Sequence, residues 1–104
     1  MAPGMVRERE GSEVMDVPEL LLYPNPNSGD QVHLFFTGIR PSVQTVSVDL
    51  IDLSGRVLVN RKLPVHDGLV DQLLELGVDI ASGTYVVKVT AGEGPSMQRL
   101  VVQR

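Results

Sequence analysis

Apolar and polar residues alternate in several short stretches of the chain. In the stretch QVHLFFT, Val32, Leu34 and Phe36 fall on one side of an extended strand, while His33 and Phe35 fall on the other. Successive side chains of a strand point to opposite faces, so this pattern predicts a half-buried β-strand. The same alternation returns in VQTVSVDLID, TYVVKVTA and the closing SMQRLVVQR. Short strands are therefore the main elements that the pattern predicts.

The expected strands cover residues 17–23, 31–37, 43–52, 56–63, 69–76, 84–91 and 96–104. Beyond residues 31–37, the side chains expected to face the core are Val46, Val48, Leu50, Val57, Val59, Tyr85, Val87, Val89, Leu100 and Val102. The stretch LVDQLLEL is ambiguous, because Leu69, Leu73 and Leu76 also share a helical stripe. We interpret it as a short strand with a loop. Six or seven short strands separated by glycine or proline, without a long helical pattern, predict an all-β, antiparallel β-sandwich.

Three turn-rich segments interrupt the strands. In YPNPNSGD, Pro24 and Pro26 have a fixed φ and no N–H, and Gly29 is suited to a positive φ, so we expect an extended strut that ends in a tight turn. Because prolines cannot extend a hydrogen-bonded ladder, the strut is also expected to block a sheet edge. The segment DLSGR, with its turn residues Ser54 and Gly55, predicts a β-hairpin.

A further glycine precedes a tyrosine by two positions in ASGTYVVKV. Gly83 allows a sharp passage from loop into strand, and Tyr85 is expected to bury its ring while its hydroxyl bonds to the backbone. Taken alone, each of these features is structural rather than functional.

The 104 residues are expected to form one domain with a leader. Residues 1–16 are polar, acidic and aperiodic, which predicts a flexible leader before a β-sandwich of residues 17–104. The net charge is −4, and residues 1–20 alone carry five acidic and two basic side chains. No basic stripe indicates nucleic acid and no lysine or arginine run indicates a membrane surface, so a mixed, soluble surface is expected.

The chain has no cysteine, which excludes disulfides, thiolate metal sites and cysteine nucleophiles. The first residues contain no apolar signal-peptide core. Two explanations remain open, a cytosolic protein or a piece of a longer secreted chain, and we favour the second.

Catalytic chemistry is poorly supported by the sequence. His33 and His66 have no nucleophile at a known motif spacing, and Asp67 and Asp71 lack the spacing of a calcium loop. A carbohydrate-binding surface normally needs planar aromatic rings, and Phe35 is the only aromatic residue expected to face outward on a strand. The sequence therefore gives little support for carbohydrate binding. We therefore expect no enzyme activity, no metal and no cofactor.

The motifs YPNPNSG, VDLIDLSGRVL, DIASGTYVVKV and QRLVVQR, taken in this order from about Leu20 to Arg104, resemble the type A C-terminal sorting domain of type IX secretion cargo proteins, found in Bacteroidota. The positions that match the family's motifs are Tyr23, Pro24, Asn25, Pro26, Gly29, Asp52, Gly55, Arg56, Gly83, Tyr85, Val89, Arg99, Val101, Val102 and Arg104. Family members often carry lysines near the last strand, where this chain has arginines with Gln98 and Gln103.

The resemblance implies an immunoglobulin-like β-sandwich attached to a larger secreted cargo. It implies recognition by the type IX translocon or a shuttle component, removal by a sortase-like protease, and cargo that is released or joined to surface lipopolysaccharide. We expect the cut between Glu10 and Glu19, where the chain is expected to be disordered. We expect recognition at the last strand and around Tyr85, by strand addition, side-chain pockets or capture of the terminal carboxylate.

A second reading stays open, an autonomous surface module that binds carbohydrate or matrix. A weak homodimer through unpaired edge strands is also compatible with the pattern.

Overall fold

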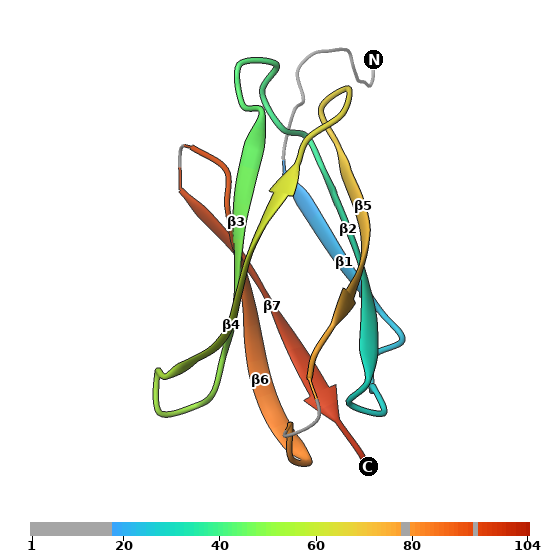
Figure 1. Ribbon diagram of the computed structural model, residues 1–104. Coiled ribbons are helices and arrows are strands. Elements are labelled where there is room, and N and C mark those ends of the chain that lie inside the picture. The colour runs from blue at the N-terminus through green and yellow to red at the C-terminus, as the bar shows by residue number, and fades with distance from the viewer. Residues whose placement is uncertain (1–17, 78–79, 93) are drawn as a thin grey trace, which may run out of the picture.

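The computed structural model describes residues 18–77, 80–92 and 94–104, and every regular element in these ranges is a β-strand (Figure 1). The strands are β1 (Glu19–Tyr23), β2 (Gln31–Thr37), β3 (Thr45–Ile51), β4 (Val57–Pro64), β5 (Val70–Glu75), β6 (Gly83–Thr90) and β7 (Pro95–Val102). Each predicted strand is present, with ends that differ by up to two residues. The expected leader and most of the expected cleavage region lie outside the described residues.

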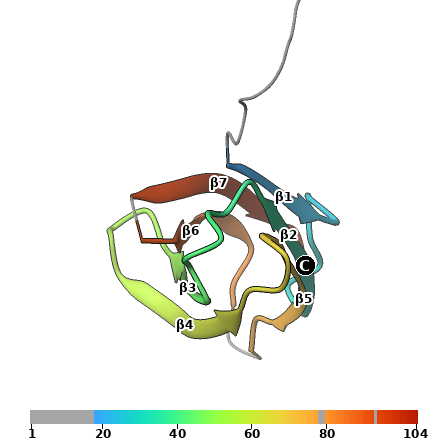
Figure 2. The ribbon, with the colours of Figure 1, turned by 90° about the horizontal axis from the view of Figure 1, so that it is seen from above.

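The strands form two antiparallel sheets that pack face to face. One sheet has the order β1-β2-β5 and the other has the order β4-β3-β6-β7. Viewed from above, β7 lies beside β1 and β4 lies beside β5, so the two sheets nearly close around the core (Figure 2). The central pairs β2–β5 and β3–β6 correspond to the B–E and C–F pairs of immunoglobulin domains. The prediction of an immunoglobulin-like β-sandwich is confirmed.

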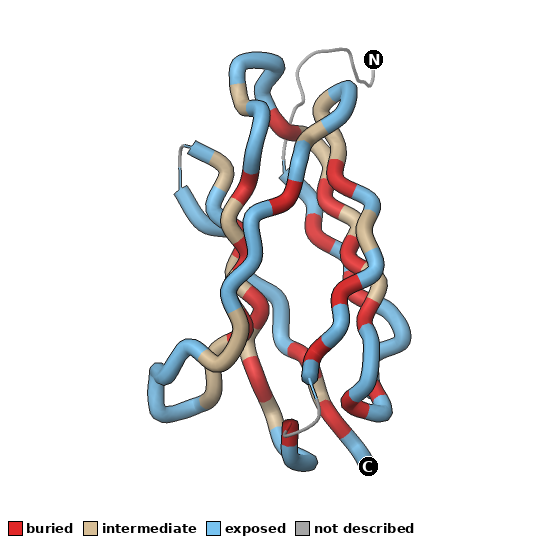
Figure 3. The backbone as a smooth tube through the Cα atoms, viewed as in Figure 1, coloured by how far each residue is buried: buried red, intermediate tan, exposed pale blue. Residues whose placement is uncertain are grey.

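The core consists of the inward side chains of both sheets. Buried and exposed residues alternate along the strands (Figure 3), as the pleat of a strand requires. The predicted core residues that are buried are Val32, Leu34, Phe36, Val46, Val48, Leu50, Tyr85, Val87, Val89, Leu100 and Val102. Aliphatic side chains dominate this set, and burial of their apolar surface is the main favourable contribution to folding.

Val57 does not face the core, and this prediction is wrong. In the β3–β4 ladder, Leu50 pairs with Val59 and Ile51 pairs with Val57, so the register shifts between Leu50 and Ile51. The bulge places Leu58 as an extra residue on β4 and turns Val57 to the outer side, where it is 51% exposed. Val59 keeps its inward orientation and packs against the core.

The ambiguous stretch of residues 69–76 forms β5, as interpreted, and no helix. Val70 and Leu74 are buried against the core, whereas Leu73 points outward and is 55% exposed. The helical stripe in the sequence was therefore coincidental, because tertiary pairing with β2 decides the conformation of this segment.

Candidate functional site

Most segments that carry the sequence motifs meet at one end of the sandwich, which we call the motif end. It comprises residues 24–29, the 52–56 turn, residues 80–83 and residues 99–104. Gly83 pairs with Val102, and Asn27 forms an isolated parallel bridge with Val102. Ile51, just before the 52–56 turn, pairs with Val86 near the start of β6, which places the turn at the same end. The C-terminus lies at this end, and β1 begins at the opposite end (Figure 1).

Asn25 binds the free edge of the last strand through its side chain. Its Nδ2 donates to the carbonyl oxygen of Arg99 at 2.8 Å, and its Oδ1 accepts from the N–H of Val101 at 3.0 Å. The side-chain amide thus satisfies one donor and one acceptor of β7, as a neighbouring strand would.

Asn27 continues this contact through its backbone. Its N–H donates to the Val101 carbonyl, and its own carbonyl accepts from the N–H of Gln103, both at 2.7 Å. The outer edge of β7 is therefore occupied from Arg99 to Gln103 by the segment that follows β1. A partner strand cannot pair along this part of the edge unless residues 25–27 first leave it.

The side chain of Asn27 organises the turn from within. It is 2% exposed, donates to the carbonyl oxygens of Pro24 at 3.1 Å and Gln31 at 2.7 Å, and accepts from the N–H of Gly29 at 2.7 Å. Sequence reasoning did not select Asn27 as a functional residue. The available signal was an asparagine two residues before a glycine, which is typical of a side chain that bonds to its own turn.

Residues 24–26 form bends, so the predicted extended strut is wrong. The peptide bonds before Pro24 and Pro26 are both cis. The physical cause of the compact shape is the set of three side-chain hydrogen bonds of Asn27, which draws Pro24, Gly29 and Gln31 around one point. The segment still lies along a sheet edge, that of β7.

Gly29 gives room to the Arg104 side chain. Its φ is +94°, as predicted, and an added Cβ would lie 2.9 Å from Nε of Arg104. The Arg104 guanidinium donates to the carbonyl oxygens of Gly29, at 3.2 Å, and Ile80, and the Arg104 N–H donates to Oγ of Ser82 at 2.9 Å. Arg104 therefore links the opening turn to the loop before β6.

The 52–56 turn is held by one carboxylate. Oδ1 of Asp52 accepts from the Ser54 hydroxyl at 2.6 Å and from the N–H groups of Ser54 at 3.0 Å and Arg56 at 2.9 Å. The Ser54 hydroxyl is the largest cause that lowers the pKa of Asp52, followed by the N–H of Arg56. Leu53 at the tip is 75% exposed, so the turn presents an apolar side chain on a fixed backbone.

Tyr85 anchors the start of β6. Its ring is buried, and its hydroxyl donates to the Ala81 carbonyl at 2.6 Å, which confirms the predicted backbone partner. This arrangement corresponds to the tyrosine corner of immunoglobulin-like domains. Tyr85 therefore fixes the loop that receives Arg104.

Tyr85 adjoins the motif end through Ala81, whereas two other motif residues lie elsewhere. Val89 is a buried core residue that pairs with Ser96, towards the opposite end. Tyr23 points outward from β1, is 49% exposed, and stacks on His33 with ring centroids 4.8 Å apart. Phe35 is thus not the only outward aromatic residue, contrary to the prediction, because Tyr23 shares its face.

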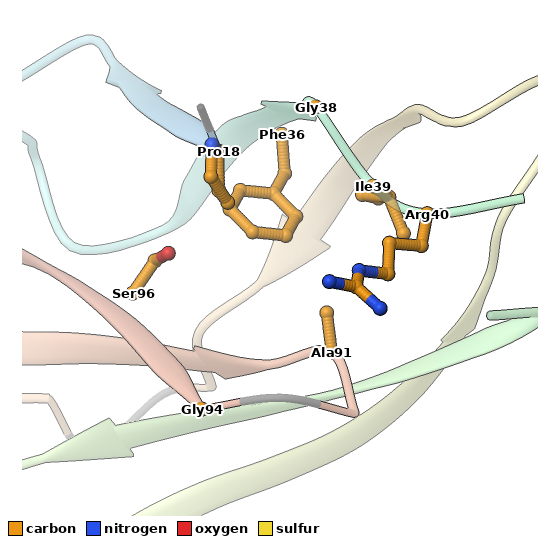
Figure 4. Close-up of a pocket in the computed structure, with 8 residues that line it drawn as sticks. All are labelled: Pro18, Phe36, Gly38, Ile39, Arg40, Ala91, Gly94 and Ser96. Carbon is orange, nitrogen blue, oxygen red and sulfur yellow. The ribbon is translucent and has the colours of Figure 1, made fainter. Parts of the chain in front are cut away.

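No group of three metal-binding side chains occurs among the described residues. The His33 side chain instead contacts that of Asp71, its diagonal neighbour on β5. A pocket at the opposite end is lined by Phe36 and Pro18 on one side and by Arg40 and Ala91 on the other (Figure 4). Of the described residues that line it, Arg40 alone is titratable.

Within the described ranges, no helix is long and apolar enough to cross a membrane. Two comparisons with known proteins bear on identity. A search of curated proteins finds no match to the chain. A family model described as secretion system C-terminal sorting domain matches residues 21–103, a range that contains the whole motif end except Arg104. The chain therefore belongs to the family of type IX secretion C-terminal sorting domains.

Proposed function

We propose that this domain carries a larger cargo protein across the outer membrane by presenting its motif end to the type IX translocon or its shuttle component. The sorting signal itself follows from the family, and it implies cargo that reaches the cell surface or beyond. The observation that supports this site is the convergence of four motif segments, distant in sequence, at one end of a rigid sandwich.

The edge contacts of Asn25 and Asn27 favour recognition through side-chain pockets over recognition by strand addition. Strand addition along residues 99–103 would compete with hydrogen bonds that the domain already makes. Side chains that point away from the sheet remain accessible, including Leu53 and Arg56 on the turn and Arg99 on β7. We infer that the partner reads these outward side chains.

We further propose that a sortase-like protease removes the domain after export, and that the cargo is released or joined to surface lipopolysaccharide. A cut between residues 10 and 19 would fall before β1, which begins at the end opposite the motif end. Docking and cleavage would then involve opposite ends of the sandwich, so the protease could act while the motif end is bound.

An export assay tests the proposed site. Residues 17–104 are fused behind a reporter with a periplasmic signal, in a bacterium that has the type IX system, and the reporter is measured in medium and cells. The double variant Arg56→Gln, Arg99→Gln is expected to reduce export about fivefold or more, since charged side chains at interfaces guide and strengthen docking.

The matched control is Arg61→Gln, Lys62→Gln, which removes two exposed cations from the middle of β4. It should be exported like the unaltered fusion, and urea unfolding of both variants checks that the fold is retained. Full export of the Arg56, Arg99 variant would reject the motif end as the docking site. Retention of the unaltered fusion in the cell would reject the proposed function as a whole.

A further inference from the structure

The outer face of the three-stranded sheet carries a second exposed patch, separate from the motif end. Leu21 of β1 pairs with Phe35 of β2, and in the next outward row Tyr23, His33 and Leu73 lie side by side on β1, β2 and β5. Leu21, Tyr23 and Leu73 are 48%, 49% and 55% exposed. Neighbouring strands lie about 4.8 Å apart, so these side chains form one continuous patch, which we call the apolar face.

The charged residues around the apolar face have one sign. Glu19 on β1 and Asp71 and Glu75 on β5 point to the same side as the apolar residues and are exposed. The three strands, all of whose residues are described, contain no lysine or arginine. His33 stacks on Tyr23 within its own row and contacts Asp71, which lies opposite Phe35 in the neighbouring row.

The outer face of the opposite sheet differs in its charge. This face carries Lys62, Lys88 and Arg99 with Asp49, and these charged residues lie among polar residues and the apolar Ile51, Val57, Val86 and Met97. Lys62 donates to Ser47 at 3.3 Å, and Asn60 donates to Asp49 at 2.5 Å. The two outer faces therefore differ mainly in charge, because the four-stranded sheet presents cations and the three-stranded sheet presents carboxylates only. Exposure of the apolar side chains on the three-stranded sheet to water is unfavourable unless a partner covers them.

We propose that the apolar face is a docking surface for a protein of the export machinery that presents aliphatic side chains flanked by lysine or arginine. The apolar rows supply the central contact, and the three carboxylates select cations at its margin. This inference rests on the proposed function, because the partner is taken from that machinery. A symmetric pair of copies is disfavoured, since it would place three carboxylates against three others.

Two synthetic peptides, KVKLKVK and EVELEVE, test the charge selection on the isotope-labelled 104-residue chain. The cationic peptide is expected to shift the amide signals of Leu21, Phe35 and Leu73, with an affinity about tenfold or more above that of the anionic peptide. Its affinity should fall in 0.5 M salt, because screening weakens exposed charge pairs.

The variant Leu21→Thr, Leu73→Thr introduces β-branched, strand-compatible residues and is expected to lose about tenfold in peptide affinity and to reduce export of the reporter fusion. Met97→Thr is the control, because Met97 is 60% exposed on the other sheet. Equal binding of the two peptides, signal shifts confined to the four-stranded sheet, self-association through this face, or preferential binding of neutral oligosaccharides there would each overturn the inference.

The two proposals fail in distinguishable ways. If the unaltered fusion is not exported, the proposed function is wrong. If it is exported and the Leu21→Thr, Leu73→Thr fusion is exported equally well, the docking role of the apolar face is wrong and the sorting role stands.

Discussion

At the scale of single residues, the motif end depends on one buried amide. Asn27 is the only buried polar residue in the described part of the chain. Its side chain makes three hydrogen bonds, and its backbone makes two to β7. Buried polar groups are tolerated when they are fully paired, and a paired amide of this kind specifies one conformation of the turn. Asn27 therefore positions Asn25 and Gly29 for their contacts with Arg99 and Arg104.

Asn27→Ala should lower the free energy of unfolding by about 2–3 kcal/mol, because it leaves the carbonyls of Pro24 and Gln31 and the N–H of Gly29 without partners. Urea unfolding followed by circular dichroism measures this. Asn60→Ala is the control, since its side-chain bonds are on the exposed surface, and it should cost less than about 1 kcal/mol. Equal costs for the two variants would contradict the role given to Asn27.

At the scale of elements, the turns are fixed by short-range hydrogen bonds and the strands by their neighbours. The 52–56 turn closes with the Gly55 N–H donating to the Asp52 carbonyl at 3.0 Å, while the Asp52 carboxylate fills its interior. This turn is complete within five residues. In contrast, the outward orientation of Val57, just after it, depends on the register with β3.

The carboxylate makes the turn sensitive to acid. The pKa of Asp52 is lowered in the folded chain, so its contribution to stability is present in full above the unfolded pKa of about 4 and is lost as the pH falls through the folded pKa. NMR titration of the Asp52 carboxyl carbon should show this lowered midpoint. In Ser54→Ala the midpoint should rise towards the ordinary value, because the largest lowering contribution is gone. Identical midpoints in both chains would disprove this cause.

At the scale of the whole molecule, β7 completes the fold and, in the proposed function, also contributes to the signal. Leu100 and Val102 are fully buried, Arg99 and Val101 point outward, and the edge holds Asn25 and Asn27. The other edge strands include β4 and β5, which adjoin each other. The weak homodimer through edge strands stays a prediction, and β4 and β5 are the edges at which to test it.

Deletion of residues 99–104 is expected to abolish cooperative unfolding. It removes Leu100 and Val102 from the core, which costs at least about 4 kcal/mol in a domain whose total stability is of the order of 5–15 kcal/mol. Thermal unfolding and the chemical-shift dispersion of the NMR spectrum measure the loss. The control is Arg99→Gln, which leaves the core intact and should unfold cooperatively. Loss of export in the truncated chain would therefore reflect unfolding. A truncated chain whose NMR spectrum keeps the native chemical-shift dispersion would show that residues 99–104 are dispensable for the fold.

The sequence by itself determined the strands, most of their inward residues, the 52–56 hairpin and the family, because alternation, turn residues and the motifs can be read directly along the chain. It also indicated that Gly29 has a positive φ and that Tyr85 bonds to the backbone. Only the tertiary structure decided that Asn25 and Asn27 bind β7, that Arg104 covers Gly29, that Val57 turns outward, and that Leu21, Tyr23 and Leu73 form one face. The physical reason is that these contacts join residues up to 76 positions apart, and their geometry is set by strand register and by the packing of two sheets, which no local pattern encodes.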